Sequence, residues 1–185
     1  NDHFSELMNK KNGKQPSLSE LIGLLHYAKK DSSIKGIYIK CAENPNGYAA
    51  TEEIRKALID FKKSNKFIVA YAETISQKGY MMANVADQIY THPQGGMEWV
   101  GFNYETIFFK GLIDKLEIEP QIFYAGKFKS ATEPFRYAQM SEANKLQTGI
   151  WLNSIYNNFI QGAAEMRHLN ADSIKAFANE GKVQN

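Results

Sequence analysis

The run from Gly126 to Phe135 reads GKFKSATEPF and places a lysine, Lys129, where it could act as a base. A glycine opens this loop, and the apolar residues 120–125 before it are predicted to form a β-strand. Aromatic side chains flank the lysine at Phe123, Tyr124, Phe128 and Phe135. Desolvation by apolar neighbours disfavours the ammonium form of a lysine, and a neutral lysine can take the proton of a serine hydroxyl. The run therefore indicates a general base, against the alternative of a solvated loop lysine.

The composition is that of a globular protein with a sizeable core. The 185 residues are 43% hydrophobic and 12% aromatic, and the net charge is +2. This small charge, with a basic cluster only at Lys10, Lys11 and Lys14, argues against a nucleic-acid partner. The single cysteine, Cys41, excludes an internal disulfide and is expected to be a buried thiol. No signal peptide or membrane-spanning run is present, and the ends at Asn1 and at Asn185, shortly after Gly181-Lys182-Val183, lead us to expect a piece of a longer chain.

The elements that must position the lysine alternate between helices and strands. We predict a tail or linker over residues 1–16 and a single α/β domain over residues 17–185, because strands alternating with helices are typical of parallel β–α units. The predicted helices begin at the Ser17–Glu20 capping box, at Thr51, at Ser76, near Phe109, at Ser141 and at Asn170 or Asp172. Besides residues 120–125, the predicted strands cover residues 34–41, 66–72, 88–91 and 97–101, with a turn at 93–96. The inward positions include Ile54, Leu58, Phe61, Ile150, Ile155 and Phe159.

Three segments together resemble a known family. They are ISQKGYMMANVADQIYTHPQG (75–95), GLIDKLEIEPQIFYAGKFKSATEPF (111–135) and MSEANKLQTGIWLNSIYNNF (140–159). The chain resembles the N-terminal half of the long, tandem-domain form of the signal peptide peptidase A (protease IV) family. These are membrane-anchored serine proteases with a Ser/Lys dyad. The resemblance implies an α/β fold built as a spiral of β–β–α units, like that of Clp protease and the crotonases.

The resemblance implies that Lys129 is the general base. Lys127 is the rival, because residues two apart share a face in an extended chain. The Ser-Ala pair that follows the family's lysine stands here as Ser130-Ala131, which selects Lys129. We expect the amine to become desolvated once a partner half docks on the loop.

The nucleophile expected in this family is missing from its usual place. Single-domain relatives have a segment like A-S-G-G-Y-Y, and the corresponding residues here are Ser76-Gln77-Lys78-Gly79-Tyr80-Met81. Gln77 occupies the nucleophile position, and Ser76, one residue away, is expected to be a structural cap. The resemblance implies that the serine comes from a C-terminal half absent from this chain. The chain would then be half of a serine endopeptidase that degrades cleaved signal peptides, inactive alone.

Two further features have open roles. The turn Asn44-Pro45-Asn46-Gly47 resembles a Gly-rich turn near the oxyanion site of related domains, so the Gly47 backbone could bind substrate, although a plain connecting turn is favoured. Glu133 either orients the lysine loop or forms a surface pair with Arg136.

The expected partners follow from the resemblance. They are the C-terminal catalytic half of the same protein, signal peptides bound as an added extended strand, and further copies in a homo-oligomer, with an apolar face exposed where the missing half docks. The full-length protein would be anchored in a bacterial membrane, with its catalytic part in the periplasm or outside the cytoplasmic membrane. We expect no cofactor and no metal, since the four histidines lack ligand spacing. A crotonase-like acyl-CoA enzyme and a noncatalytic scaffold or interaction domain are the alternatives.

Overall fold

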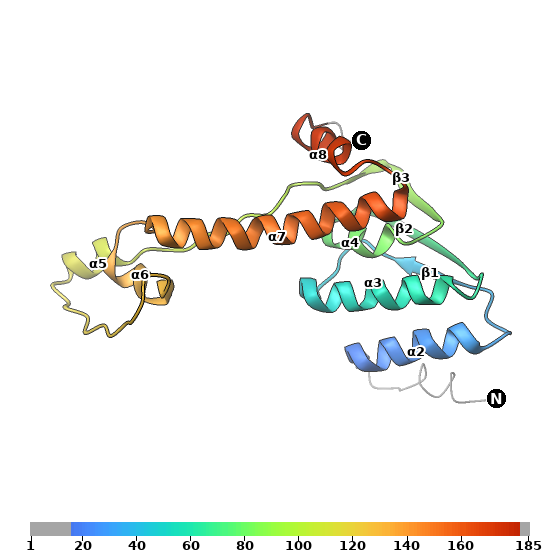
Figure 1. The fold of residues 1–185 in the computed structure, drawn as a ribbon, viewed down its shortest axis with the longest axis horizontal. Helices are drawn as coiled ribbons and strands as arrows, with labels where there is room; N and C mark the ends of the chain where they lie inside the picture. The colour runs from blue at the N-terminus through green and yellow to red at the C-terminus, as the bar shows by residue number, and fades with distance from the viewer. Residues whose placement is uncertain (1–15, 182–185) are drawn as a thin grey trace. The chain divides into compact units, whose positions relative to one another are not determined.

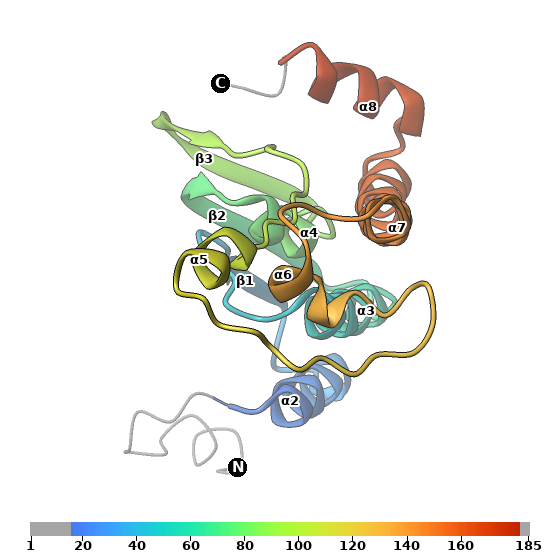
Figure 2. The same ribbon diagram turned by 90° about the vertical axis from the view of Figure 1, so that its left-hand side faces the viewer.

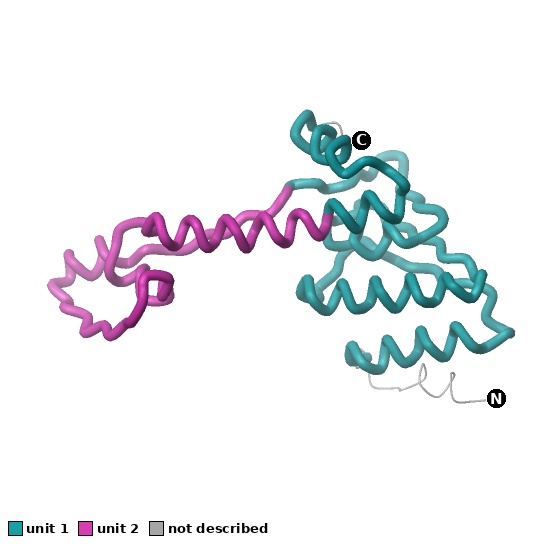
Figure 3. Tube along the Cα trace, in the orientation of Figure 1, with its two compact units in different colours: residues 1–100, 160–185 teal, residues 101–159 magenta. Residues whose placement is uncertain are grey.

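A computed structural model describes residues 16–181 of the chain. These residues form two compact units, shown in Figure 3. The first unit contains the residues up to 100 and those from 160 onward, and the second contains residues 101–159. The tail predicted for residues 1–16 lies outside the described residues except for Pro16. The single α/β domain over 17–185 stays a prediction.

The first unit is built on a three-stranded parallel sheet (Figure 1). Its strands are β1 (Gly36–Lys40), β2 (Phe67–Ile75) and β3 (Gln88–Met97), and they lie in the order β1-β2-β3. Parallel neighbours need a crossover connection. Helix α3 (Tyr48–Lys62) provides it between β1 and β2, and helix α4 (Gln77–Ala83) provides it between β2 and β3. The chain is therefore a mixed α/β protein with a small parallel sheet, as predicted.

Helix α2 (Leu18–Lys30) begins at the capping box that the sequence predicts. The Glu20 N–H donates to Ser17 Oγ, and the Ser17 N–H donates to the Glu20 carboxylate at 2.8 Å. These two bonds satisfy donors that a helix leaves free at its start. Figures 1 and 2 show α3 between the sheet and α2.

The core of the first unit lies between α2, α3 and the sheet. Ile54, Leu58 and Phe61 of α3 are buried there, as their spacing predicts. They pack with Leu25 of α2 and with the alternating inward residues of β2. Cys41, at the end of β1, is fully buried, and burial raises the pKa of its thiol, which fits the predicted structural role.

Strand β3 corrects the prediction of two short strands separated by a turn at residues 93–96. The structure has one strand from Gln88 to Met97, which pairs with β2 on both sides of an irregularity between Ala72 and Thr74. Gly95 approaches β2 so closely that a Cβ there would overlap the Glu73 carbonyl oxygen. Pairing with β2 thus overrides the local turn signal, and Pro93 is tolerated because β3 is an edge strand of the sheet.

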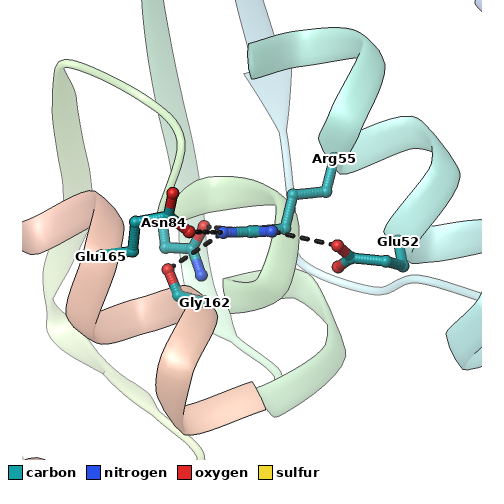
Figure 4. Close-up of polar contacts among 5 residues, drawn as sticks. All are labelled: Glu52, Arg55, Asn84, Gly162 and Glu165. Atoms are coloured by element: carbon teal, nitrogen blue, oxygen red, sulfur yellow. Dashed lines mark hydrogen bonds and ion pairs between the residues drawn. The ribbon is translucent and has the colours of Figure 1, made fainter. Parts of the chain in front are cut away.

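Arg55 joins three helical segments of the first unit, and no local pattern in the sequence indicates this role. Its side chain extends from α3 toward α4 and the C-terminal part of α7 (Glu142–Arg167), as Figure 4 shows. Nε donates to Asn84 Oδ1 at 3.4 Å and Nη2 donates to the Gly162 carbonyl at 3.1 Å. Nη1 donates to Glu52 at 3.1 Å. Only 6% of Arg55 is exposed, so these bonds compensate for a buried charge.

The second unit contains helix α5 (Lys110–Lys115), the 3-10 turn η1 (Ser130–Thr132), helix α6 (Glu133–Arg136) and the first part of α7. The α5 and α6 segments are joined by a stack of Phe109 on Phe135, with ring centroids 5.7 Å apart, and by a hydrogen bond from the Phe109 N–H to the Pro134 carbonyl. Ser141 caps α7 as predicted, because its Oγ accepts from the Asn144 N–H at 3.2 Å.

Many large apolar side chains of the second unit are exposed. Ile150, predicted to be a core residue, is 64% exposed on α7, and Phe123 is 92% exposed. Phe159 is buried as predicted, and Ile155 is half-buried. The period of apolar residues along α7 thus predicts a helix, but it does not predict which of these residues are buried by the rest of this chain.

The last helix, α8 (Ala171–Asn179), begins at Asn170, whose side chain accepts from the Asp172 and Ser173 N–H groups. No helix between residues 16 and 181 is long and apolar enough to cross a membrane.

Candidate active site

The lysine loop begins at Gly126, in the second unit. Gly126 has φ +94°, a left-handed conformation that favours glycine. The Lys129 N–H donates to the Gly126 carbonyl at 3.3 Å, which closes the loop just before η1. Residues 120–125 are not the strand that their apolar pattern predicts, because they pair with no strand among the described residues.

A hollow of about 510 Å³ lies at this loop. One wall consists of residues 126–129, and the other consists of Leu146, Gln147 and Ile150 of α7. Lys129 and its rival Lys127 both line the hollow and are both exposed. The hollow therefore combines amines with apolar side chains, but its lining does not choose between the two lysines.

The aromatic residues around the loop do not bury Lys129 in this chain. Phe123, Tyr124, Phe128 and Phe135 are all exposed. Two of them contact other cations instead: Lys127 Nζ lies 5.9 Å from the Phe128 ring centroid, and the Arg136 guanidinium lies 3.6 Å from that of Tyr124. The Lys129 ammonium makes no hydrogen bond or ion pair with other residues of the described range 16–181. Its amine is thus free to meet a group from outside this unit.

Glu133, the eighth residue of the GKFKSATEPF run, is buried and bonded to α7. Its carboxylate accepts from the Ser141 hydroxyl at 2.6 Å, the Ser141 N–H at 3.2 Å and Asn144 Nδ2 at 2.9 Å. Burial alone raises the pKa of this carboxyl, but the hydrogen bonds from Ser141 and Asn144 outweigh burial and hold the pKa below its usual value. Of the two predicted roles, the surface pair with Arg136 is wrong. Arg136 instead donates from Nε to Thr132 Oγ1 at 3.1 Å.

The segment that should carry the nucleophile lies in the first unit, at the start of α4. Ser76 is the N-cap, and its Oγ accepts from the Gly79 N–H at 3.1 Å, which confirms the predicted structural role. Gln77, at the nucleophile position, is buried as the first residue of the helix. A Cβ on Gly79 would overlap the Cys41 carbonyl oxygen, so α4 lies against the end of β1. The amide side chain of Gln77 cannot serve as an acyl-transfer nucleophile.

The turn at residues 44–47 is organised by the buried side chain of Asn44. Asn44 Oδ1 accepts from the Asn46 N–H at 3.1 Å, an Asx turn, and Nδ2 donates to Thr51 Oγ1 at 2.8 Å. Gly47 is the N-cap of α3, so the predicted cap at Thr51 is wrong. Thr51 is buried inside the helix because Asn44 and the Gly47 carbonyl satisfy its hydroxyl. The Asn-Pro pair is the sequence signal that could have identified Asn44, and the substrate-binding role of the Gly47 backbone stays a prediction.

Comparison with known proteins supplies the family. Protease 4 of Haemophilus influenzae is 33% identical to this chain over 184 residues, which cover 97% of this chain and 29% of that protein. The chloroplastic serine protease SPPA of Arabidopsis thaliana is 30% identical over 166 residues, covering 90% of this chain and 24% of that protein. A putative protease of Methanocaldococcus jannaschii is 30% identical over 163 residues, covering 88% of this chain and 51% of that protein.

This chain therefore spans between about a quarter and a half of the length of these relatives. Residues 60–184 match peptidase family S49, a stretch that includes both the lysine loop and the start of α4. The match agrees with the resemblance that the GKFKSATEPF run and its neighbouring segments indicate. The chain belongs to peptidase family S49.

Proposed function

We propose that this chain is the base-supplying half of a serine peptidase with a Ser/Lys dyad. Two structural observations within residues 60–184, the stretch that matches family S49, together support this most. Lys129 makes no hydrogen bond or ion pair with other described residues, and it lines a hollow that also contains the apolar side chains of Phe128, Leu146 and Ile150. The nucleophile position holds Gln77, and the adjacent Ser76 hydroxyl is engaged as a helix cap. A catalytic serine must then come from a second half.

The reaction follows from these roles. Neutral Lys129 takes the proton of the serine hydroxyl as the serine oxygen attacks the scissile carbonyl. The ammonium then gives that proton to the leaving amine, and an acyl-enzyme forms. Water, deprotonated by Lys129 in its neutral form, hydrolyses the ester and regenerates both groups. Burial of the lysine loop by the second half would favour the neutral amine and exclude competing water.

The substrate, fold and assembly belong to the same proposal. The substrates would be cleaved signal peptides, bound as an extended strand whose apolar side chains enter hollows such as the one beside Lys129. The parallel sheet with helical crossovers would be the start of a Clp protease-like spiral. The exposed apolar side chains of the second unit would be covered by the C-terminal half and by other copies in a homo-oligomer. The assembled protein would be anchored at a bacterial membrane with this part outside the cytoplasm.

The S49 match favours a peptidase over the crotonase-like acyl-CoA enzyme that the sequence left open. A noncatalytic scaffold remains distinguishable by experiment. The test mixes the 185-residue chain with the C-terminal half and measures hydrolysis of an apolar peptide, together with labelling by a serine-reactive phosphonate.

We expect hydrolysis only when both halves are present, with the label on a serine of the C-terminal half. Stoichiometric labelling of Ser76, with hydrolysis by this chain alone, would overturn the half-site proposal. A C-terminal half that is labelled and fully active without this chain would leave this chain the role of a scaffold.

A further inference from the structure

The buried carboxylate of Glu133 is unusual for its residue type. Only 3% of Glu133 is exposed, whereas glutamates are almost never fully buried unless they are paired. No cation forms an ion pair with it among the described residues: its three hydrogen-bond donors are neutral groups of Ser141 and Asn144, and the Arg136 guanidinium adds a smaller electrostatic effect that lowers the pKa of Glu133. These donors all lie at the start of α7, where the helix dipole also favours a negative charge. The carboxylate is therefore held in its ionised form by the first turn of one helix.

Glu133 is connected to the lysine by a short and constrained stretch of chain. Lys129 is directly followed by η1, and η1 runs directly into Glu133 at the start of α6. The last residue of η1, Thr132, is also fixed, because its hydroxyl accepts from Arg136. At the other end, the Lys129 N–H is bonded to the Gly126 carbonyl. A fixed Glu133 therefore restricts where the backbone of Lys129 can lie.

The helix that holds Glu133 is also the opposite wall of the hollow. Leu146, Gln147 and Ile150 follow Asn144 along α7, within the next two turns. The bonds from Glu133 to Ser141 and Asn144 thus tie the lysine loop to the helix that faces it across the hollow.

We propose that Glu133 is a positioning residue for Lys129: its ionised carboxylate sets the placement of the lysine loop against α7, and so the placement of the base. This inference rests on the function proposed above. Glu133 touches no reacting atom, and its effect on the reaction passes through Lys129. The alternative is that Glu133 only stabilises the start of α7.

The test uses the full-length protein that contains this sequence. Glu133→Gln keeps the size of the side chain but removes its charge and replaces one acceptor oxygen by an N–H₂ donor, which among the three present donors only the Ser141 hydroxyl can meet, by reversing its hydrogen bond. The matched control is Glu142→Gln in the same turn of α7, where the carboxylate is exposed and bonded to Lys145. Each variant is assayed for kcat and KM with an apolar peptide and for the rate at which a phosphonate labels the catalytic serine.

We expect Glu133→Gln to lower kcat and the labelling rate by about 10- to 100-fold, because misplacing a base by about 1 Å has an effect of that order. KM should change by less than about threefold, since substrate contacts remain. Glu142→Gln should match the wild type.

A double-mutant cycle separates positioning from general stability. If Glu133 acts through Lys129, Glu133→Gln should not slow the residual labelling that remains in a Lys129→Ala background. Wild-type kcat in Glu133→Gln, or an equal loss from Glu133→Gln with and without Lys129, would overturn the inference. Wild-type activity of Lys129→Ala alone would instead refute the proposed function, so the two failures are distinguishable. If Glu133→Gln does not fold, Asn144→Ala tests the same tie, and an unchanged labelling rate in that variant would also overturn the inference.

Discussion

Replacing Arg55 by methionine tests how α3 holds residues 160–167, the part of α7 that belongs to the first unit. The variant keeps an unbranched apolar stem in the space of the arginine stem but removes the guanidinium. Asn84 Oδ1 and the Gly162 carbonyl, both buried, lose their bonds to a charged donor. The Glu52 carboxylate also loses its bond, but that side chain is 37% exposed and can bond to water instead.

The magnitude follows from these bonds. A hydrogen bond to a charged group contributes about 1.5–3 kcal/mol, so the two buried acceptors together account for roughly 3–5 kcal/mol, with the longer 3.4 Å bond at the low end. Removing the buried charge recovers part of this, since desolvating an ion costs several kcal/mol. We therefore expect a net loss of about 2 kcal/mol in the free energy of unfolding. In a chain of this length that corresponds to a fall of about 4–8 °C in Tm.

The assay is calorimetric unfolding of the 185-residue chain at pH 7. Glu52→Gln is the control, because it removes one partly exposed ion pair of Arg55, leaves the more exposed Glu165 at 3.8 Å from Nη2, and should change stability by less than about 0.5 kcal/mol. A free energy of unfolding of Arg55→Met equal to that of the wild type would refute the stabilising role of the buried guanidinium bonds. Equal destabilisation by Glu52→Gln and Arg55→Met would refute it too, since the bond to Glu52 would then be the main interaction.

Two further stability predictions use single substitutions in the same chain. Gly79→Ala places a Cβ against the Cys41 carbonyl oxygen and should destabilise the chain by about 1–3 kcal/mol. Gly23→Ala, in open space on α2, should stabilise the chain by up to about 1 kcal/mol. Urea unfolding measures both changes, and equal effects of the two variants would contradict the close approach of α4 to β1. The second prediction concerns the pH dependence of the stabilisation by Glu133. Burial raises the pKa of this carboxyl, but its hydrogen bonds lower the pKa by more, so the pKa in the folded state lies below that in the unfolded state. Its stabilising effect is then complete above the unfolded pKa of about 4.3 and is lost as the pH falls through the folded pKa. The stability difference between wild type and Glu133→Gln should be present at pH 7 and shrink below about pH 4; a difference that stays constant down to pH 2 would contradict this assignment.

Local patterns were sufficient where a short stretch determines its own structure. The Ser17–Glu20 box, the caps at Ser76 and Ser141 and the inward face of α3 could all be predicted, because each depends on residues within one or two helical turns. The resemblance carried by GKFKSATEPF led to the S49 family in the same way.

The remaining features depend on partners that are distant in the sequence. Arg55 bonds to Gly162, 107 positions along the chain, and no periodicity connects them. Residues 88–97 contain a turn signal at Pro93, yet pairing with β2 makes them one strand. Residues 120–125 have the apolar pattern of a strand but no described strand beside them. In each case the local structure depends on which distant segment lies beside the residues in the fold, and a local sequence pattern contains no information on that segment.

The central claim is that Lys129 supplies the base, and hydrolysis of an apolar peptide by Lys129→Ala in the full-length protein tests it most directly. Lys127→Ala is the matched variant, because Lys127 lines the same hollow. We predict that Lys129→Ala lowers kcat by about 10²- to 10⁴-fold, the range for loss of a general base, with an unchanged Tm, and that Lys127→Ala retains most of the activity. Near-normal turnover by Lys129→Ala, or loss of activity only in Lys127→Ala, would contradict the account.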